Sequence, residues 1–252
     1  MVVGVAVRES YRPVAEKGAA RRVLIVTPTY DERENLEWFV SGVFGVLPHA
    51  HVLVVDDASP DGTGQLADDM AQADARVFVL HREKKLGLGT AYAEGFQWAM
   101  LRQYDLVFEN DADLSHDPAH LPAFLEAFER GADVVVGSRN VPGGGVVGWG
   151  LGRNLLSKGG SLYARVVLGV DVRDLTTGFK GYTRRALVAI DPATLQSNGY
   201  SFQIETTYRA LKAGLSVVEV PITFVDRRAG KSKMSRKIFA EAMRVVWRLR
   251  GS

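Results

Sequence analysis

Cysteine is absent from the 252-residue sequence, which excludes disulfide bonds and thiolate metal sites and favours a reducing compartment. No apolar run approaches the roughly 20 residues that a membrane-spanning helix needs. The first residues lack the basic start, long apolar core and cleavage site of a signal peptide. From these absences we expect a cytoplasmic protein, either soluble or peripheral to a membrane.

The net charge is small, +2, but it is unevenly distributed along the chain. Residues 227–250 contain nine Lys or Arg and one acid, Glu241, which leaves 22 of the 31 basic and 28 of the 29 acidic residues elsewhere. A basic segment on an acidic body is compatible with an anionic partner: nucleic acid, phospholipid headgroups or a phosphorylated substrate. Taken alone, such a run is more often a solvated helix face.

The composition is that of an ordinary globular protein, 46% hydrophobic and 24% charged, in a chain long enough for one large α/β domain. Short apolar runs that predict buried strands alternate with segments of helical spacing. The predicted strands are 22–28, 51–55, 76–80, 106–109 and 133–136, and the predicted helices are 36–47, the segment after 63, about 90–102 and 121–129. This alternation predicts a mostly parallel sheet with helices on both faces.

Polar residues follow the predicted strands at 28–32, 56–57, 111–113 and 137–139. In parallel sheets ligands bind beyond the carboxyl ends of the strands, so we expect these four clusters to converge on one edge. Asp111 and Asp113 could hold a divalent cation there, because carboxylate oxygens suit Mg²⁺ or Mn²⁺. An isolated Asp-x-Asp is more often turn chemistry or a cap, so the pair alone does not identify a site.

After Arg139 the pattern changes. The glycine-rich segment 141–150 predicts a mobile loop without regular structure, and 151–168 has the spacing of an amphipathic helix interrupted at Gly159-Gly160. We further predict a turn and short strand at 174–182, a helix at 201–212, a strand at 216–226 that is bent at Pro221 or lies at a sheet edge there, and a C-terminal amphipathic helix at 233–250. Residues 1–21 are expected to be a flexible arm and 22–252 a single domain.

Seven ordered motifs in this chain resemble those of a known family. They are PTYDERENL at 28–36, VDDASPDGT at 55–63, KKLGLGT at 84–90, DADLSH at 111–116, GSR at 137–139, DLTTGF at 174–179 and VPITFVDR at 220–227. Together they resemble the dolichol-phosphate mannosyltransferases (polyprenol monophosphomannose synthases) of the inverting GT-A glycosyltransferase family 2. The resemblance implies a GT-A (nucleotide-diphospho-sugar transferase) fold and transfer of mannose from GDP-mannose to a polyprenyl, dolichyl-type monophosphate.

The resemblance also implies which residues contact the donor. These are Pro28, Tyr30, Glu32, Val55, Asp57, Asp111, Ala112, Asp113, Arg139, Arg227 and Lys233. The expected cofactor is Mg²⁺ or Mn²⁺, held by Asp113 with Asp111 and Ser115, although some members of the family have Gln at the position of Ser115. Catalysis is expected to rest on charge stabilisation of the departing diphosphate by Asp113 with its metal, Arg139, Arg227 and Lys233.

The resemblance assigns the acceptor phosphate to Arg139, Arg153 and Ser157, within an acceptor loop and amphipathic helix at 138–168. Residues 227–252 would form a basic lid and C-terminal helix. Because a polyprenyl chain is insoluble in water, the helices at 151–168 and 233–250 are the candidates for interfacial contact with a membrane. We therefore expect a peripheral protein at the inner face of the cell membrane, with any membrane protein partner left open.

Two other functions compete with this interpretation. A family 2 relative could use another donor such as UDP-glucose with the same class of acceptor. A non-catalytic nucleotide-sugar-binding subunit is the alternative of a different class, and the intact Asp pair and arginines count against it. No nucleic-acid partner is expected, because the basic C-terminal segment lacks interleaved aromatic residues.

Overall fold

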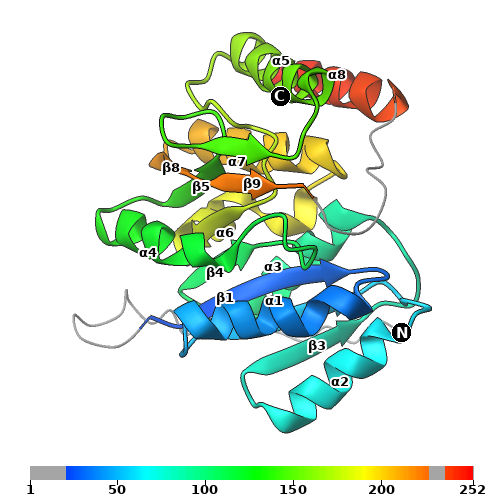
Figure 1. Ribbon diagram of the computed structural model, residues 1–252. Coiled ribbons are helices and arrows are strands. Elements are labelled where there is room, and N and C mark those ends of the chain that lie inside the picture. Colours follow the sequence, from blue (N-terminus) through cyan, green and yellow to red (C-terminus); the bar gives the residue numbers. More distant parts are fainter. Residues whose placement is uncertain (1–20, 227–235, 252) are drawn as a thin grey trace, which may run out of the picture.

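A computed structural model describes residues 21–226 and 236–251 of the chain. A seven-stranded sheet in the order β3–β2–β1–β4–β7–β5–β8 crosses its centre (Figure 1). The strands are β1 Val23–Thr29, β2 His51–Asp56, β3 Val77–His81, β4 Leu106–Glu109, β5 Val134–Ser138, β7 Lys180–Thr183 and β8 Val217–Pro221. Only β7 runs antiparallel to its two neighbours, which confirms the mostly parallel sheet that the sequence predicts.

Helices cover both faces of this sheet because its strands are apolar on both sides. Along β1, Ile25 packs into one core cluster, whereas Leu24 and Val26 pack into the other. The first cluster is completed by α1 Arg33–Val46, α2 Thr63–Ala73 and α4 Leu121–Glu129. The second contains residues of α3 Leu88–Leu101, α5 Leu151–Leu168, α6 Arg184–Ile190, α7 Tyr200–Lys212 and α8 Arg236–Gly251. The α/β fold with helices on both faces is therefore confirmed.

Close packing fixes α3 against β1. A Cβ atom added at Gly95 would lie 2.4 Å from a methyl carbon of Val26, far inside van der Waals contact, so the helix needs glycine there to approach the strand. Tyr92 lies one turn earlier on the same helix and is fully buried. The position of α3 therefore determines where the Tyr92 phenol lies relative to the strand ends.

Three predictions about the second half of the chain are wrong, and one helix was not predicted. The glycine-rich segment is not wholly irregular, because Gly145–Val147 forms β6 and pairs with β9 Thr223–Val225. The predicted strand at 216–226 divides into β8 and β9, which belong to different sheets. Helix α5 runs through Gly159-Gly160 without interruption, because packing outweighs a cost of about 1 kcal/mol per glycine. The sequence pattern also missed α6.

Helices α5 and α8 lie side by side at one end of the molecule (Figure 1). The described part of α8 agrees with the predicted C-terminal helix. Most of the predicted N-terminal arm and residues 227–235 of the predicted lid lie outside the described residues. No helix in the described part of the chain is long and apolar enough to cross a bilayer.

Candidate active site

The four polar clusters do meet at one edge of the sheet, because β1, β2, β4 and β5 all point the same way. At the adjacent ends of β1 and β2, the Thr29 hydroxyl donates to Asp56 at 2.9 Å, and the Asp57 amide donates to the Thr29 carbonyl at 3.0 Å. Asp56 also accepts a hydrogen bond from the Ser59 hydroxyl at 2.6 Å, so its carboxylate stabilises the turn that follows β2. Its neighbour Asp57 is the residue expected to contact the donor base.

The predicted nucleotide residues lie around these two strand ends. Pro28, Tyr30 and Glu32 are half-buried, whereas the side chain of Val55 is enclosed in the core. Asp57 accepts a hydrogen bond from the Arg82 guanidinium at 2.5 Å. The sequence patterns did not indicate Arg82 as a partner, and it gives Asp57 a fixed orientation with a buried positive charge beside it.

Tyr92 orients Asp111. Its buried phenol donates to Oδ1 of Asp111 at 2.6 Å. Burial, reinforced by the charges of Asp111 and Glu109, raises the pKa of Tyr92 well above its usual value, so the phenol keeps its proton and remains a donor. A Cβ atom at Gly178 would lie 3.6 Å from the other oxygen of Asp111. The glycine therefore leaves room beside that oxygen.

The segment after Asp111 supplies further oxygen atoms. Asp113 accepts from the Ser115 amide at 3.0 Å, and the hydroxyl of Ser115 is buried without a hydrogen-bond partner among the described residues. The same part of the chain holds no group of three or more His, Cys, Asp or Glu that could bind a metal unaided. Two carboxylates and an unpaired hydroxyl fit Mg²⁺ or Mn²⁺, which often leave coordination positions to substrate phosphates.

His116, next to the carboxylate pair in sequence, packs against aromatic rings. Its buried ring lies 5.5 Å from the ring of Phe179 and 5.0 Å from that of Phe224. Phe224 in turn contacts Trp149, with ring centroids 5.0 Å apart. This aromatic cluster connects the Asp111–Ser115 segment to β9 and to the loop before α5.

A buried ion pair lies beneath Asp111. Lys180 on β7 is 3.7 Å from Glu109 at the end of β4, and neither side chain is exposed. Lys180 also donates to the Gln203 side chain at 2.7 Å, and Tyr182 donates to Glu109 at 3.1 Å. Burial lowers the pKa of Lys180 to about 8, although the negative charge of Glu109 opposes this shift. Burial likewise raises the pKa of Glu109, although the positive charge of Lys180 opposes that shift. Nothing in the sequence pattern indicated this network.

Arg139, just after β5, is held in one orientation by Asp174. Nε and Nη2 of Arg139 each donate to the Asp174 carboxylate at 2.7 Å. Burial alone would lower the pKa of Arg139, but the negative charge of Asp174 has the larger effect and raises it. Burial alone would raise the pKa of Asp174, but the positive charge of Arg139 lowers it. Nη1 donates no hydrogen bond to any described residue, so two N–H groups remain for a ligand.

The segment 174–179 connects the two halves of the site. At its start Asp174 fixes Arg139, and near its end Gly178 lies beside Asp111 and Gln203. The motif at 174–179 was recognised from the sequence, but its pairing with Arg139 was not. The structure therefore places the metal-ligand candidates and Arg139 on one connected scaffold.

Of the other predicted acceptor residues, Arg153 lies near Arg139 and is engaged in an ion pair. Its guanidinium donates to Asp226 at 2.8 Å and lies 4.2 Å from the centre of the Trp149 ring. Arg139 lies 5.5 Å from the centre of the same ring. Ser157 follows Arg153 by one turn of α5 and is half-buried. Arg227 and Lys233, predicted to act on the donor diphosphate, lie outside the described residues.

Comparison with known protein families assigns the chain to one of them. The model of the family described as glycosyl transferase family 2 matches residues 24–190, which is more than half of the chain. The chain belongs to glycosyltransferase family 2. The expectation of a family 2 enzyme that transfers a sugar is thereby confirmed.

Two curated relatives of this family 2 glycosyltransferase match it over most of its length. A protein of Mycolicibacterium smegmatis named polyprenol monophosphomannose synthase is 50% identical over 234 residues, which cover 92% of this chain and 88% of the relative. A protein of Micrococcus luteus named undecaprenyl-phosphate mannosyltransferase is 50% identical over 222 residues, which cover 88% of this chain and 91% of the relative.

Solved structures confirm the GT-A fold of this family 2 glycosyltransferase. Glucosyl-3-phosphoglycerate synthase from Mycobacterium tuberculosis, crystallised with Mn²⁺, UDP-glucose and phosphoglyceric acid, superposes with a TM-score of 0.68. The match covers 96% of this chain and 86% of the other at 19% identity, so it concerns the fold alone.

Proposed function

We propose that this glycosyltransferase transfers mannose from GDP-mannose to a polyprenyl monophosphate. The observation that supports this most directly is the 50% identity, over about nine-tenths of the chain, to two relatives named for mannosyl transfer to polyprenyl phosphates. The site geometry is compatible with it. A carboxylate pair and an arginine whose Nη1 has two N–H groups left for a phosphate both lie at the carboxyl edge of the sheet.

The reaction is a single displacement at the anomeric carbon. An acceptor phosphate oxygen attacks C1 of the mannose, the bond from C1 to the donor diphosphate breaks, and the products are polyprenyl β-D-mannosyl phosphate and GDP. The attacking oxygen is already ionised at neutral pH, so no strong general base is required. Arg139, with its orientation set by Asp174, would bind phosphate oxygens at the point where the acceptor meets the donor.

Asp113, with Asp111 and Ser115, would hold the divalent cation, Mg²⁺ or Mn²⁺. When bound, this ion neutralises the charge that develops on the departing diphosphate. Tyr92 would keep Asp111 in its orientation through the 2.6 Å hydrogen bond. Pro28, Tyr30, Glu32 and Asp57 would contact the nucleotide. Arg227 and Lys233, which lie outside the described residues, would bind the diphosphate.

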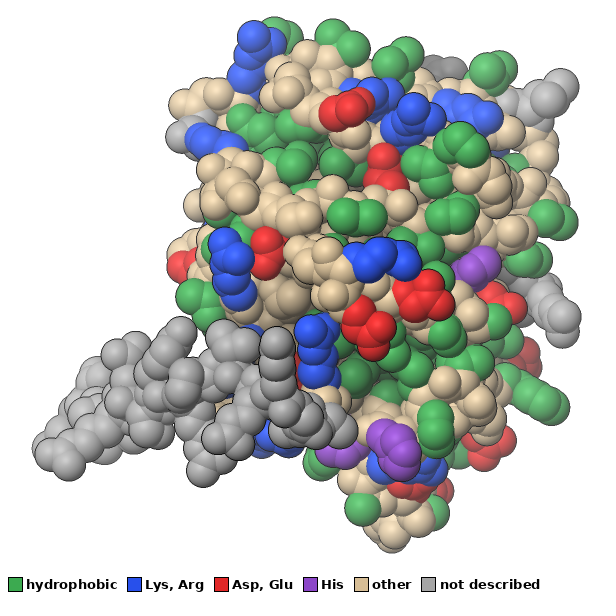
Figure 2. Space-filling view, turned by 90° about the vertical axis from the view of Figure 1, so that its left-hand side faces the viewer, with side chains coloured by type: hydrophobic (Ala, Val, Ile, Leu, Met, Phe, Trp, Pro, Cys, Tyr) green, Lys and Arg blue, Asp and Glu red, His purple; other side chains and the backbone are tan. Residues whose placement is uncertain are grey.

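The enzyme is expected to meet its lipid acceptor at the surface of the cell membrane. Helix α5 exposes Leu155, Leu162 and Val166, spaced seven and four residues apart along one side, and α8 exposes Trp247. At the end of the molecule where α5 and α8 lie, Lys and Arg side chains are interspersed with hydrophobic ones (Figure 2). Apolar residues flanked by cations suit the interface of an anionic leaflet.

A panel of donors tests the function. GDP-mannose, other GDP-sugars and UDP-sugars are offered with polyprenyl phosphate, with and without a chelator. We expect transfer from GDP-mannose and loss of transfer on chelation. Preferential transfer from UDP-glucose would replace the donor assignment, and no transfer from any donor would favour a non-catalytic subunit.

One substitution tests the carboxylate assignment. Asp113→Ala should reduce the rate to background, because it removes the carboxylate predicted to be the principal metal ligand. Asp117→Ala is the control, since Asp117 is exposed and only caps a short helix through the Ala119 amide at 2.8 Å. Near-normal turnover by the Asp113 variant would remove this residue from the metal site.

A further inference from the structure

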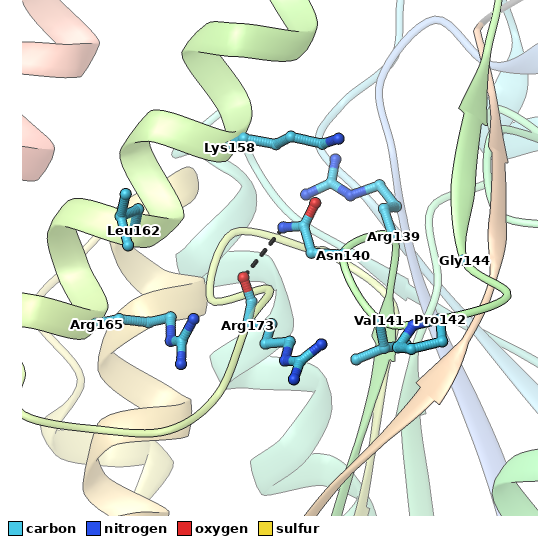
Figure 3. A pocket seen from close by; sticks show the side chains of 9 residues that line it. All are labelled: Arg139, Asn140, Val141, Pro142, Gly144, Lys158, Leu162, Arg165 and Arg173. Carbon is cyan, nitrogen blue, oxygen red and sulfur yellow. Dashed lines mark hydrogen bonds between the residues drawn. The ribbon is translucent and has the colours of Figure 1, made fainter.

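A closed polar site lies where β1 and β4 end, directly before the carboxylate pair in the chain. It is separate from the cavity of about 600 Å³ beside Arg139, which is lined by exposed residues of α5 such as Leu162 and adjoins the acceptor side of the candidate active site (Figure 3). The closed site is formed by Thr27 on β1 and by Asn110, the residue before Asp111. Neither Thr27 nor Asn110 has any exposed surface.

The polar atoms of these two side chains have no hydrogen-bond partner among the described residues. They are Oγ1 of Thr27 and both Oδ1 and Nδ2 of Asn110. About nine-tenths or more of buried polar groups in proteins are paired with protein or with ordered water, because an unpaired one keeps the full cost of leaving solvent. Three such atoms on two buried residues therefore indicate that a further group binds to them.

The strand register places the two side chains next to each other. Strands β1 and β4 are parallel, and the last pair of their ladder is Val26 with Glu109. The Asn110 amide then donates to the Val26 carbonyl at 3.2 Å, so Asn110 lies opposite Thr27. The ladder ends there because Pro28, the next residue of β1, has no N–H. Neighbouring strands are about 4.7–4.9 Å apart, a separation that one water molecule can bridge.

Both side chains also point to the same face of the sheet, because residues alternate between faces along a strand. Thr27 follows Ile25 by two residues, and Asn110 follows Phe108 by two residues. Ile25 and Phe108 both belong to the core cluster that α1, α2 and α4 complete. Asp111, in contrast, bonds to a residue of α3 on the opposite face. The site therefore lies on the α1 face, behind the residue that carries the first carboxylate.

The chemistry of the three atoms favours water as the bound group. The single Thr27 hydroxyl can pair with one polar atom of the Asn110 amide, which leaves the other without a partner. An ion of either sign would meet an unfavourable group, since the amide presents both N–H donors and a carbonyl oxygen. An apolar ligand would leave all three atoms unpaired. Water both donates and accepts, and it needs about two to four polar partners.

We propose that Thr27 and Asn110 bind an ordered water molecule on the α1 face of the sheet. The water holds the Asn110 side chain and thereby fixes the backbone that carries Asp111, whereas Tyr92 holds the carboxylate itself from the other face. Thr27 and Asn110 are thus positioning residues that act through Asp111. Their effect on catalysis rests on the proposed function, but the presence of the water does not.

Thermal unfolding of single and double variants tests whether the two side chains share a partner. Thr27→Val and Asn110→Leu each remove polar atoms at nearly constant volume. Each should lower the Tm by about 2–10 °C, because the other side chain loses part of its hydrogen bonding. The double variant should be at least as stable as the less stable single variant, because it buries no unpaired polar atom at the site. Additive losses of Tm would overturn the shared site.

A crystal structure of the full-length protein, at a resolution that shows ordered waters, identifies the bound group. We expect one water within hydrogen-bond distance of the Thr27 and Asn110 side chains in the wild type, and none in the double variant. A direct hydrogen bond between the two side chains with no water beside it would refute the proposal, and so would any other group at this position.

Initial rates at varied Mg²⁺ or Mn²⁺ concentrations test the positioning role. The concentration for half-maximal rate should rise about tenfold in Asn110→Leu, since residues that support a metal ligand contribute about 10- to 100-fold to metal affinity. Thr27→Ser is the control, because it keeps the hydroxyl and should keep the wild-type metal dependence even if the lost methyl group lowers the Tm. An unchanged metal dependence in Asn110→Leu would refute the link to Asp111. If the wild-type enzyme transfers no sugar, the proposed function fails, while unfolding and crystallography still decide whether the water is bound.

Discussion

Removing one hydroxyl group, with Tyr92→Phe, tests whether the carboxylate pair must be oriented for catalysis. The Tyr92 phenol is buried and donates to Oδ1 of Asp111 at 2.6 Å. A hydrogen bond to a charged group contributes about 1.5–3 kcal/mol. If that energy fixes the Asp111 orientation needed in the transition state, kcat/KM for GDP-mannose should fall about 10- to 100-fold, since about 1.4 kcal/mol corresponds to tenfold.

The assay measures initial rates over a range of GDP-mannose and Mg²⁺ or Mn²⁺ concentrations. The metal concentration for half-maximal rate should rise in the Tyr92 variant, because a mobile Asp111 holds a cation less well. Tyr104→Phe is the matched control. Tyr104 is equally buried and bonds His51 at 2.5 Å, where β2 begins, away from the site. That variant should keep the wild-type kinetics and metal dependence.

The reasoning fails if the folded Tyr92 variant keeps both the wild-type kcat/KM and the wild-type metal dependence. A merely structural role for the phenol would lower the free energy of unfolding without changing the metal dependence. Denaturant unfolding of both Tyr variants separates these outcomes.

Two further predictions concern the core and the surface. Lys180→Met should lower the free energy of unfolding in urea by about 3–5 kcal/mol, because it leaves the buried Glu109 carboxylate without its ion-pair partner. Adding Glu109→Gln should restore most of the lost stability. If the double variant recovers none of it, the buried charge is not the cause of the loss. Leu155→Glu and Val166→Glu on α5 should weaken flotation of the protein with anionic liposomes. Leu101→Glu is the control, because Leu101 is equally exposed but lies on α3, and this variant should float like the wild type. If all three variants lose flotation equally, α5 is not the membrane contact.

Residues that directly follow a predicted strand could be placed from the sequence alone. The strand before Asp111, and the carboxyl edge where it meets Asp57 and Arg139, follow from local periodicity and the geometry of parallel sheets. The family motifs added the roles of these residues. The structure agrees with the convergence of the strand ends, because it depends on the order and direction of a few strongly apolar strands.

Partners far apart in sequence could not be placed in this way. Arg139 and Asp174 are 35 positions apart, and Lys180 on β7 meets Glu109 only because β7 is inserted next to β4. A lysine is normally exposed, so no local pattern marks Lys180 as a core residue. The uninterrupted α5 is a similar case, because packing against α8 and the core overrides the local preference of two glycines.

Strand β7 lies between β4 and β5 and divides the sheet into two parts, and different substrates are expected to bind on each. Apart from Arg139 and the two residues of the predicted lid, every residue expected to contact the donor comes from the first 113 positions, on the β1, β2 and β4 side of β7. The residues expected to bind the acceptor phosphate come from later in the chain: Arg139 follows β5, and Arg153 and Ser157 lie on α5. We therefore expect mutations on the β5 side, other than at Arg139, to change the acceptor that is used with little effect on the donor. New acceptor specificity could evolve, or be engineered, by varying the later half of the chain while the earlier half stays constant.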